Sequence, residues 1–168
     1  TMAEQLGLPF CYQRFVRPYI NGTACPSPVH TDTQQPNGEY VAMWFPEGQT
    51  GGLYKVDDWF EFHDTPGMQG NKSASLDAFY TTNSVGETSL KKARYRWMWE
   101  KKFNAGKLDD DYTDLFAAVN ALNLPDTSIY PAQVESVIEA DGWLTALAFR
   151  HVLGDWDGYG YSRGKKET

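Results

Sequence analysis

The organisation of this chain is decided near its C-terminal end by the stretch HVLGDWDGYGYSRGK, residues 151–165. A helical pattern of apolar residues leads into it from Asp141 and stops at Gly154. The side chains that share one face of this expected helix are Trp143, Leu144, Leu147, Ala148 and His151. Because that face is apolar, we expect the helix to be buried.

The turn after this helix has the composition of a loop that handles a metal or a phosphate. Asp155 and Asp157 flank a tryptophan, glycines follow, and Arg163 and Lys165 come next. Carboxylates supply oxygen ligands or a base, and glycines allow the backbone to approach an anion. Aspartate after a helix-ending glycine is also ordinary turn chemistry. From the local residues alone, both interpretations remain open.

Length and composition indicate a globular chain. It has 168 residues, of which 41% are hydrophobic and 15% aromatic, enough to build a substantial core. A net charge of −7 argues against general nucleic-acid binding, which needs a basic surface. No apolar run is long enough to span a membrane, and no signal-peptide pattern opens the chain. Whether Cys11 and Cys25 form a bridge is left open by the sequence.

The sequence predicts an α+β fold with N-terminal antiparallel strands followed by a four-helix half. Residues 1–85 are expected to be mainly strands and loops, with a hairpin turn at Asn21-Gly22 and the clearest strand at 39–45. Residues 86–168 are expected to be mainly helical. The predicted helices cover 90–103, 112–122, a segment opened by Pro131, and 141–154. We expect one domain over 1–168.

Other candidate motifs carry less chemistry. The densest acidic cluster is Asp109, Asp110, Asp111 and Asp114, and acids at a helix start interact favourably with the helix dipole, which favours a structural role. The histidines have no zinc spacing, and neither a nucleophile elbow nor a Walker phosphate loop is present. His151, one turn before the acidic pair, is more typical of a packing residue than of a catalytic one.

Seven segments, taken together and in order, resemble the spore-coat protein kinase (CotH) family over nearly the whole chain. They are Leu8-Pro9, Tyr19-Ile-Asn-Gly22, Gly52-Leu-Tyr-Lys55, Ala93-Arg-Tyr-Arg-Trp97, Asp111-Tyr-Thr-Asp-Leu-Phe116, Ala121-Leu-Asn123 and Gly154-Asp-Trp-Asp-Gly-Tyr159. The resemblance implies part of an atypical protein-kinase fold. It also implies transfer of the ATP γ-phosphate to Ser or Thr of a coat protein with Mg²⁺.

The resemblance also assigns roles to the residues of the turn. Asp157 matches the catalytic-loop aspartate that accepts the proton of the substrate hydroxyl, and Asp155 is its partner, either on the metal side or as a residue that supports a ligand from behind. Asp155 and Asp157 are therefore the candidate metal ligands. Arg163 and Lys165 are the candidate contacts to the nucleotide. The same resemblance points to a bacterial spore coat or cell envelope as the location.

Two features of the family pattern are missing from this sequence. Relatives carry a phosphate-binding lysine in an N-terminal lobe before the point where this chain begins, and a Trp-Asp-x-Asp metal motif after the point where it stops. We therefore expect an incomplete kinase domain. A non-catalytic kinase-like binding domain and a metal-assisted hydrolase of phosphate esters are the alternatives. Apolar surface left uncovered would favour a homo-oligomer.

Overall fold

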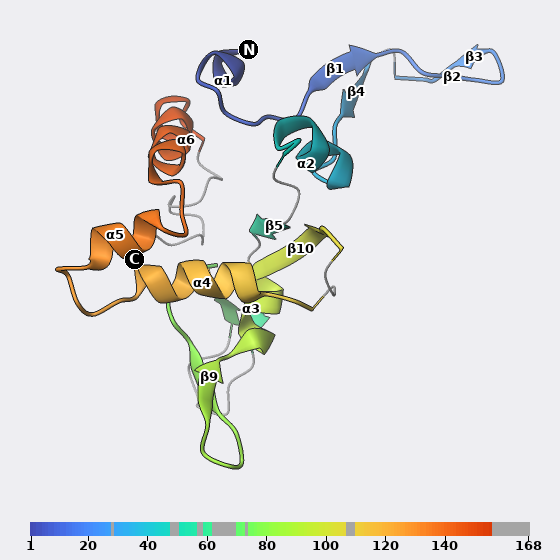
Figure 1. The fold of residues 1–168 in the computed structure, drawn as a ribbon. Coiled ribbons are helices and arrows are strands. Elements are labelled where there is room, and N and C mark those ends of the chain that lie inside the picture. Colours follow the sequence, from blue (N-terminus) through green and yellow to red (C-terminus); the bar gives the residue numbers. More distant parts are fainter. Residues whose placement is uncertain are drawn as a thin grey trace. The chain divides into compact units, whose positions relative to one another are not determined.

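The fold is given by a computed structural model, drawn in Figure 1. The structure describes residues 1–27, 29–47, 51–56, 59–61, 70–72, 74–106 and 110–155. Within these residues it is a mixed α/β protein with six helices and small antiparallel sheets, consistent with the expected α+β class. The chain divides into two compact units, Thr1–Gln49 and Thr50–Thr168.

The first unit contains two small antiparallel pairs and two helices. Strand β1 (Gln13–Val16) pairs with β4 (His30–Thr33), and β2 (Tyr19–Ile20) pairs with β3 (Thr23–Ala24). The predicted turn at Asn21-Gly22 is confirmed, because both residues have positive φ values of 49° and 80° and join β2 to β3. Helix α1 (Met2–Gln5) opens the unit with a capping box at Thr1.

The predicted strand at 39–45 is wrong, since this segment forms helix α2 (Gly38–Trp44). The Asn37 carboxamide oxygen accepts hydrogen bonds from the backbone N–H groups of Glu39 and Tyr40, at 3.0 and 3.2 Å, and so caps the first turn. Only Val41 of this helix is buried. A short apolar run is compatible with a strand or a helix, and here the hydrogen bonds from the Asn37 cap favour the helix.

The second unit is organised around one long-range antiparallel pair. Strand β5 (Gly52–Val56) pairs with β10 (Trp99–Asn104), with Trp99 opposite Val56 and an irregularity between Lys101 and Phe103. Two hairpins lie between them in sequence: β6 (Trp59–Glu61) with β7 (Gly70–Lys72), and β8 (Tyr80–Thr82) with β9 (Thr88–Leu90). Among the described residues of this unit, the strands β5 to β9 therefore precede α3, and β10 is followed by helices alone.

The helix predicted over 90–103 is only half correct. Helix α3 (Lys92–Met98) ends at Met98, and the chain continues directly as β10. Met98 and Trp99 are both buried although they belong to different elements. Apolar residues continue without interruption across Met98 and Trp99, because α3 and β10 face the same core. The pattern of apolar residues therefore does not indicate the change from helix to strand.

The core of the second unit lies among β10, α3, helix α4 (Thr113–Leu122) and the segment 74–76. Its buried members are Ala74, Leu76, Tyr95, Met98, Trp99, Tyr112, Leu115 and Val119. The predicted helix at 112–122 is α4, with Leu115 and Val119 on its buried face. Aromatic rings supply much of the packing; the Tyr95 and Phe116 centroids are 5.2 Å apart in an edge-on arrangement.

Two further helices follow, α5 (Tyr130–Glu135) and α6 (Ala140–Val152). Helix α6 was expected at 141–154 and is present, but the prediction that it is buried is wrong, since none of its residues is buried. Leu144 is 64% exposed and Trp143 43%. An apolar face on a helix does not by itself ensure that another element packs against it. In this unit the buried helical residues of the core come from α3 and α4, and not from α6. Among the described helices, none has the length and apolar character that a membrane crossing requires.

Candidate functional site

The C-terminal end of α6 is a sharply defined turn. Gly154 has a φ of +67°, a conformation that glycine adopts without strain. The Gly154 N–H donates to the His151 carbonyl at 3.0 Å, and the Asp155 N–H donates to the Arg150 carbonyl at 3.0 Å. These two bonds form a Schellman motif, which satisfies the last carbonyls of the helix. The prediction that Gly154 ends the helix is confirmed, and the turn fixes where Asp155 begins the next segment.

The Asp155 side chain folds back onto the helix that precedes it. Arg150 Nε and Nη2 both lie 2.6 Å from the same carboxylate oxygen of Asp155. The two side chains are 50% and 33% exposed, so water screens their attraction and the pair adds little to global stability. Its effect is local: it orients the carboxylate that opens the loop toward α6.

Of the residues predicted for this site, the structure places Asp155 alone. Asp157, Arg163 and Lys165 lie outside the described residues. Within the described ranges no group of acidic, histidine or cysteine side chains is arranged to hold a metal ion. Arg150 contacts one oxygen of the Asp155 carboxylate, and the second predicted ligand, Asp157, lies outside the described residues, so the Mg²⁺ site stays a prediction.

A pocket that the sequence did not indicate lies beside α6. It has a volume of about 140 Å³ and is lined by Val56, Trp99, Trp143, Ala146, Leu147 and Arg150. The Trp99 indole N–H donates to the Ser75 carbonyl at 3.1 Å, which holds that ring in place. Apolar cavities of comparable volume accept a single aromatic ring. Arg150 both lines this pocket and pairs with Asp155, so the pocket and the start of the loop share a residue.

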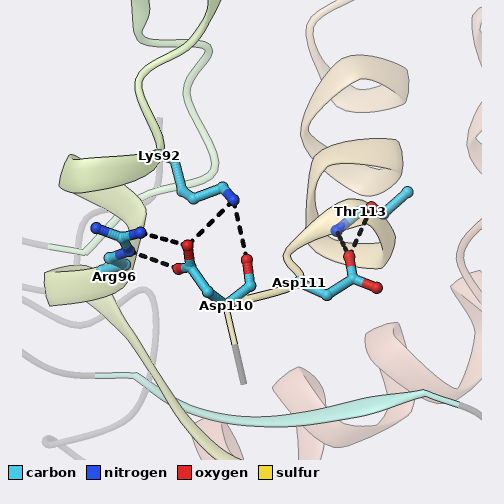
Figure 2. A network of polar contacts seen from close by, with 5 residues as sticks. All are labelled: Lys92, Arg96, Asp110, Asp111 and Thr113. Carbon is cyan, nitrogen blue, oxygen red and sulfur yellow. Dashed lines mark hydrogen bonds and ion pairs between the residues drawn. The ribbon is translucent and has the colours of Figure 1, made fainter. Parts of the chain in front are cut away.

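The acidic cluster at 109–114 makes contacts within the fold, as Figure 2 shows for Asp110 and Asp111. Asp110 accepts from Arg96 Nε at 2.6 Å, from a second Arg96 nitrogen and from Lys92 Nζ at 3.3 Å. The hydrogen bonds from Arg96, followed by that from Lys92, hold the pKa of the Asp110 carboxyl at about 2. Lys92 also donates to the Asp110 carbonyl at 2.9 Å, so α3 holds the segment that leads into α4.

The same figure shows the role of the next aspartate (Figure 2). Asp111 Oδ1 accepts from the Thr113 N–H at 3.0 Å and from the Thr113 hydroxyl at 2.6 Å, and so shapes the turn before α4. Asp109 lies outside the described residues. The contacts of Asp110 and Asp111 agree with the structural role that the sequence favoured for the cluster.

Asp114 connects α4 to the start of β5. Its carboxylate accepts from the Tyr54 hydroxyl, from the Gly52 N–H at 2.7 Å and from the Leu115 N–H at 2.9 Å. Burial alone would raise the pKa of Asp114, but these donors outweigh it and lower that pKa.

The Tyr54 side chain is affected by the same contact. Burial, followed by the hydrogen bond to Asp114, raises the pKa of Tyr54. The ammonium of Lys101 lies 5.1 Å from the Tyr54 ring centroid and 4.6 Å from that of Tyr112.

Several motifs that carry the family resemblance thus meet in the folded unit. Tyr54 comes from the Gly-Leu-Tyr-Lys segment and Asp114 from the Asp-Tyr-Thr-Asp segment. Asn123 comes from the Ala-Leu-Asn segment. Its side-chain amide nitrogen donates to the Leu76 carbonyl at 2.7 Å, and its amide oxygen accepts from the Ala78 N–H at 3.2 Å. The motifs themselves were the signal for these contacts, because nothing in local spacing connects residues about sixty positions apart.

The comparisons with known proteins agree with this distribution of motifs. The family model described as "CotH kinase protein" matches residues 1–166. No curated protein and no solved structure matches the chain. The match runs from the first unit through the core motifs and the turn after α6, and covers nearly all of the chain. On this ground the chain belongs to the CotH kinase family.

Proposed function

We propose that the chain is the part of an atypical Ser/Thr protein kinase that presents the catalytic aspartate. The observation that carries the proposal is the end of α6, where a Schellman turn and the Arg150–Asp155 pair set the start of the segment containing Asp157. The family match over 1–166 supports the same reaction class. The atypical protein-kinase fold is part of this proposal.

In the proposed reaction Asp157 accepts the proton of a serine or threonine hydroxyl. The hydroxyl oxygen forms a bond to the γ-phosphorus of ATP as the bond to the β-phosphate bridging oxygen breaks, and ADP leaves. Arg163 and Lys165 would neutralise phosphate charge. Asp155 contacts Arg150 through one carboxylate oxygen, and together with Asp157 it is the residue proposed to hold Mg²⁺. When bound there, Mg²⁺ would neutralise charge on the phosphates.

The acceptor class is proposed from the resemblance to the spore-coat kinase family. A protein hydroxyl on a spore-coat or cell-envelope protein is the proposed acceptor, and the charge of −7 suits a basic acceptor segment. The same charge opposes a nucleic-acid partner.

The test is transfer of labelled γ-phosphate from ATP, with Mg²⁺ in the buffer, to a basic Ser/Thr protein. Asp157→Asn keeps the size of the side chain and removes the base, and should reduce turnover by about 10²–10⁴-fold. Asp155→Asn should cost less, because its oxygen can still accept from Arg150. Asp111→Asn is the matched control, since its amide oxygen can still accept from Thr113. Equal turnover in the Asp157 variant and the parent would refute the assignment.

A binding domain without catalysis is the second candidate, and the pocket beside α6 favours it. Its walls are apolar apart from Arg150, which suits a flat ring carrying an acceptor or negative group. Calorimetric titration with ATP separates the two functions: binding without transfer in a folded protein supports the second. A hydrolase of phosphate esters has no such observation in its favour among the described residues.

A further inference from the structure

Two Asn-Gly pairs occur in the first unit, Asn21-Gly22 and Asn37-Gly38. This dipeptide is chemically labile, because glycine has no side chain to hinder attack by its own backbone nitrogen on the preceding carboxamide. Both asparagines are exposed to solvent, so access of water does not distinguish the two pairs. Their local structures differ in two other respects: the hydrogen bonds that the carboxamide makes, and the cost of moving the backbone around it.

The Asn21-Gly22 pair forms the tip of the β2–β3 hairpin. Among the residues that the structure describes, none makes a hydrogen bond with the Asn21 carboxamide. Opening the tip costs little, since β2 and β3 pair over two residues each and neither strand contains a buried residue. One backbone hydrogen bond, from the Cys25 N–H to the Pro18 carbonyl at 3.1 Å, closes the base of the hairpin. The backbone of Asn21 can therefore leave its turn conformation without uncovering buried surface.

The Asn37-Gly38 pair is held by the helix that it begins. The Asn37 carboxamide oxygen accepts from two backbone N–H groups in the first turn of α2, at 3.0 and 3.2 Å. Helix α2 is itself anchored in its unit, because Val41 is buried and the Trp44 indole N–H donates to the Phe10 carbonyl at 3.1 Å. Turning the carboxamide toward the Gly38 nitrogen breaks both hydrogen bonds of the cap. The same dipeptide is therefore restrained here and unrestrained at the hairpin tip.

From this contrast we propose that Asn21 is a site of spontaneous deamidation, and that the cap of α2 protects Asn37 from the same reaction. The Gly22 amide nitrogen loses its proton and forms a bond to Asn21 Cγ, while the bond from Cγ to Nδ2 breaks. The departing nitrogen takes up a proton and leaves as ammonia, and a cyclic succinimide remains. Water then adds to either succinimide carbonyl and opens the ring, so the products are an aspartyl and an isoaspartyl residue at position 21.

Both products change the hairpin. Each of them carries a carboxylate where the parent chain has a neutral amide. In the isoaspartyl product the main chain continues through the side-chain carboxyl carbon, so it is longer by one carbon atom. The two-residue turn between Ile20 and Thr23 sets the register of β2 and β3, and an added atom changes that turn. The modification therefore acts on the pairing of the two strands.

The test compares the two asparagines in the folded and in the unfolded full chain. Samples are incubated at mildly alkaline pH, with and without guanidinium chloride, and are digested with a protease that cleaves before aspartate. Because Asp32 lies between the two sites, fragment 1–31 contains Asn21 and fragment 32–56 contains Asn37, each as its sole asparagine. Mass spectrometry follows the replacement of the amide NH₂ group by a hydroxyl group in each fragment. Cleavage before position 21 itself reports the aspartyl product.

For each site the rate in the folded chain is divided by the rate in guanidinium chloride, which removes any intrinsic difference between the two sequences. We expect this ratio to be about 2- to 30-fold higher for Asn21 than for Asn37, the factor that corresponds to one N-cap interaction. Asn21→Gln is the control variant: its longer side chain does not form the succinimide, so fragment 1–31 should keep its mass. Equal ratios at the two sites, or a higher ratio for Asn37, would overturn the proposal. A mass change of fragment 1–31 that persists in Asn21→Gln would do the same, because another residue would then be reacting.

Discussion

Replacing Tyr95 with phenylalanine removes one buried hydroxyl and leaves the ring of the core in place. Tyr95 is 0% exposed. Its hydroxyl accepts from the Phe79 N–H at 3.1 Å and donates to the Asp77 carbonyl at 2.5 Å. In the variant both backbone groups lose this partner. An unsatisfied buried group costs about 1–3 kcal/mol, and since Phe79 and Asp77 are only partly buried, water recovers some of it. We expect a loss of about 2 kcal/mol.

The measurement is urea unfolding of the full chain followed by circular dichroism. Urea slopes of about 1–3 kcal/mol per molar mean that the midpoint for the second unit should fall by about 1 M with little change in slope. Tyr80→Phe is the matched control: it removes the same atom from a neighbouring tyrosine that is 60% exposed, and should change stability by less than about 0.5 kcal/mol.

The comparison of these two variants decides whether the reasoning holds. If Tyr95→Phe shifts the midpoint no more than Tyr80→Phe does, the hydroxyl is not linking the segment 77–79 to α3. A change in slope without a change in midpoint would instead indicate an altered unfolded state.

Two further predictions concern pH and the turn after α6. The folded pKa of Asp110, about 2, lies below its unfolded value, so its pairing stabilises the fold above about pH 4 and is lost as the pH falls toward 2. Thermal unfolding of Asp110→Asn should therefore vary less than the parent over that window; an unchanged profile would contradict the pairing with Arg96. Gly154→Ala meets no atom within 4 Å but forces alanine into a φ of +67°, at a cost of about 1–2 kcal/mol. Hydrogen exchange at the Asp155 amide should accelerate at least about fivefold, and unchanged protection would show that the turn is not set by the glycine.

A local signal predicted the end of α6 but not the end of α3. Gly154 ended α6 as expected, because a glycine with positive φ acts through its own backbone. The exposure of α6 could not be predicted, because a stripe of apolar residues does not say whether a surface is available to cover it. The strand expected at 39–45 failed for a local reason, since the cap at Asn37 was present in the sequence and outweighs the alternation that follows it.

Long-range pairing accounts for the other differences. The change from α3 to β10 after Met98 depends on β5, more than forty residues earlier, so no window of local sequence contains its cause. The pair between Arg150 and Asp155 is local and was not predicted, because the composition of the turn drew attention to its acids and not to the basic residue of the preceding helix. Asp157, Arg163 and Lys165 remain predictions.

The position of the β8–β9 hairpin between β5 and β10 in sequence has a consequence for how the chain tolerates changes in length. The β8–β9 pair is closed by its own turn, where the Asn83 side chain accepts from the Val85 and Glu87 N–H groups at 3.0 and 2.9 Å. Figure 1 shows that turn at the end of the hairpin. Residues added there lengthen a loop whose ends are already joined, which costs only a logarithmic term in chain entropy. The β5–β10 register stays as it is, so this turn is where an inserted epitope or fluorescent label can be carried without disturbing the core.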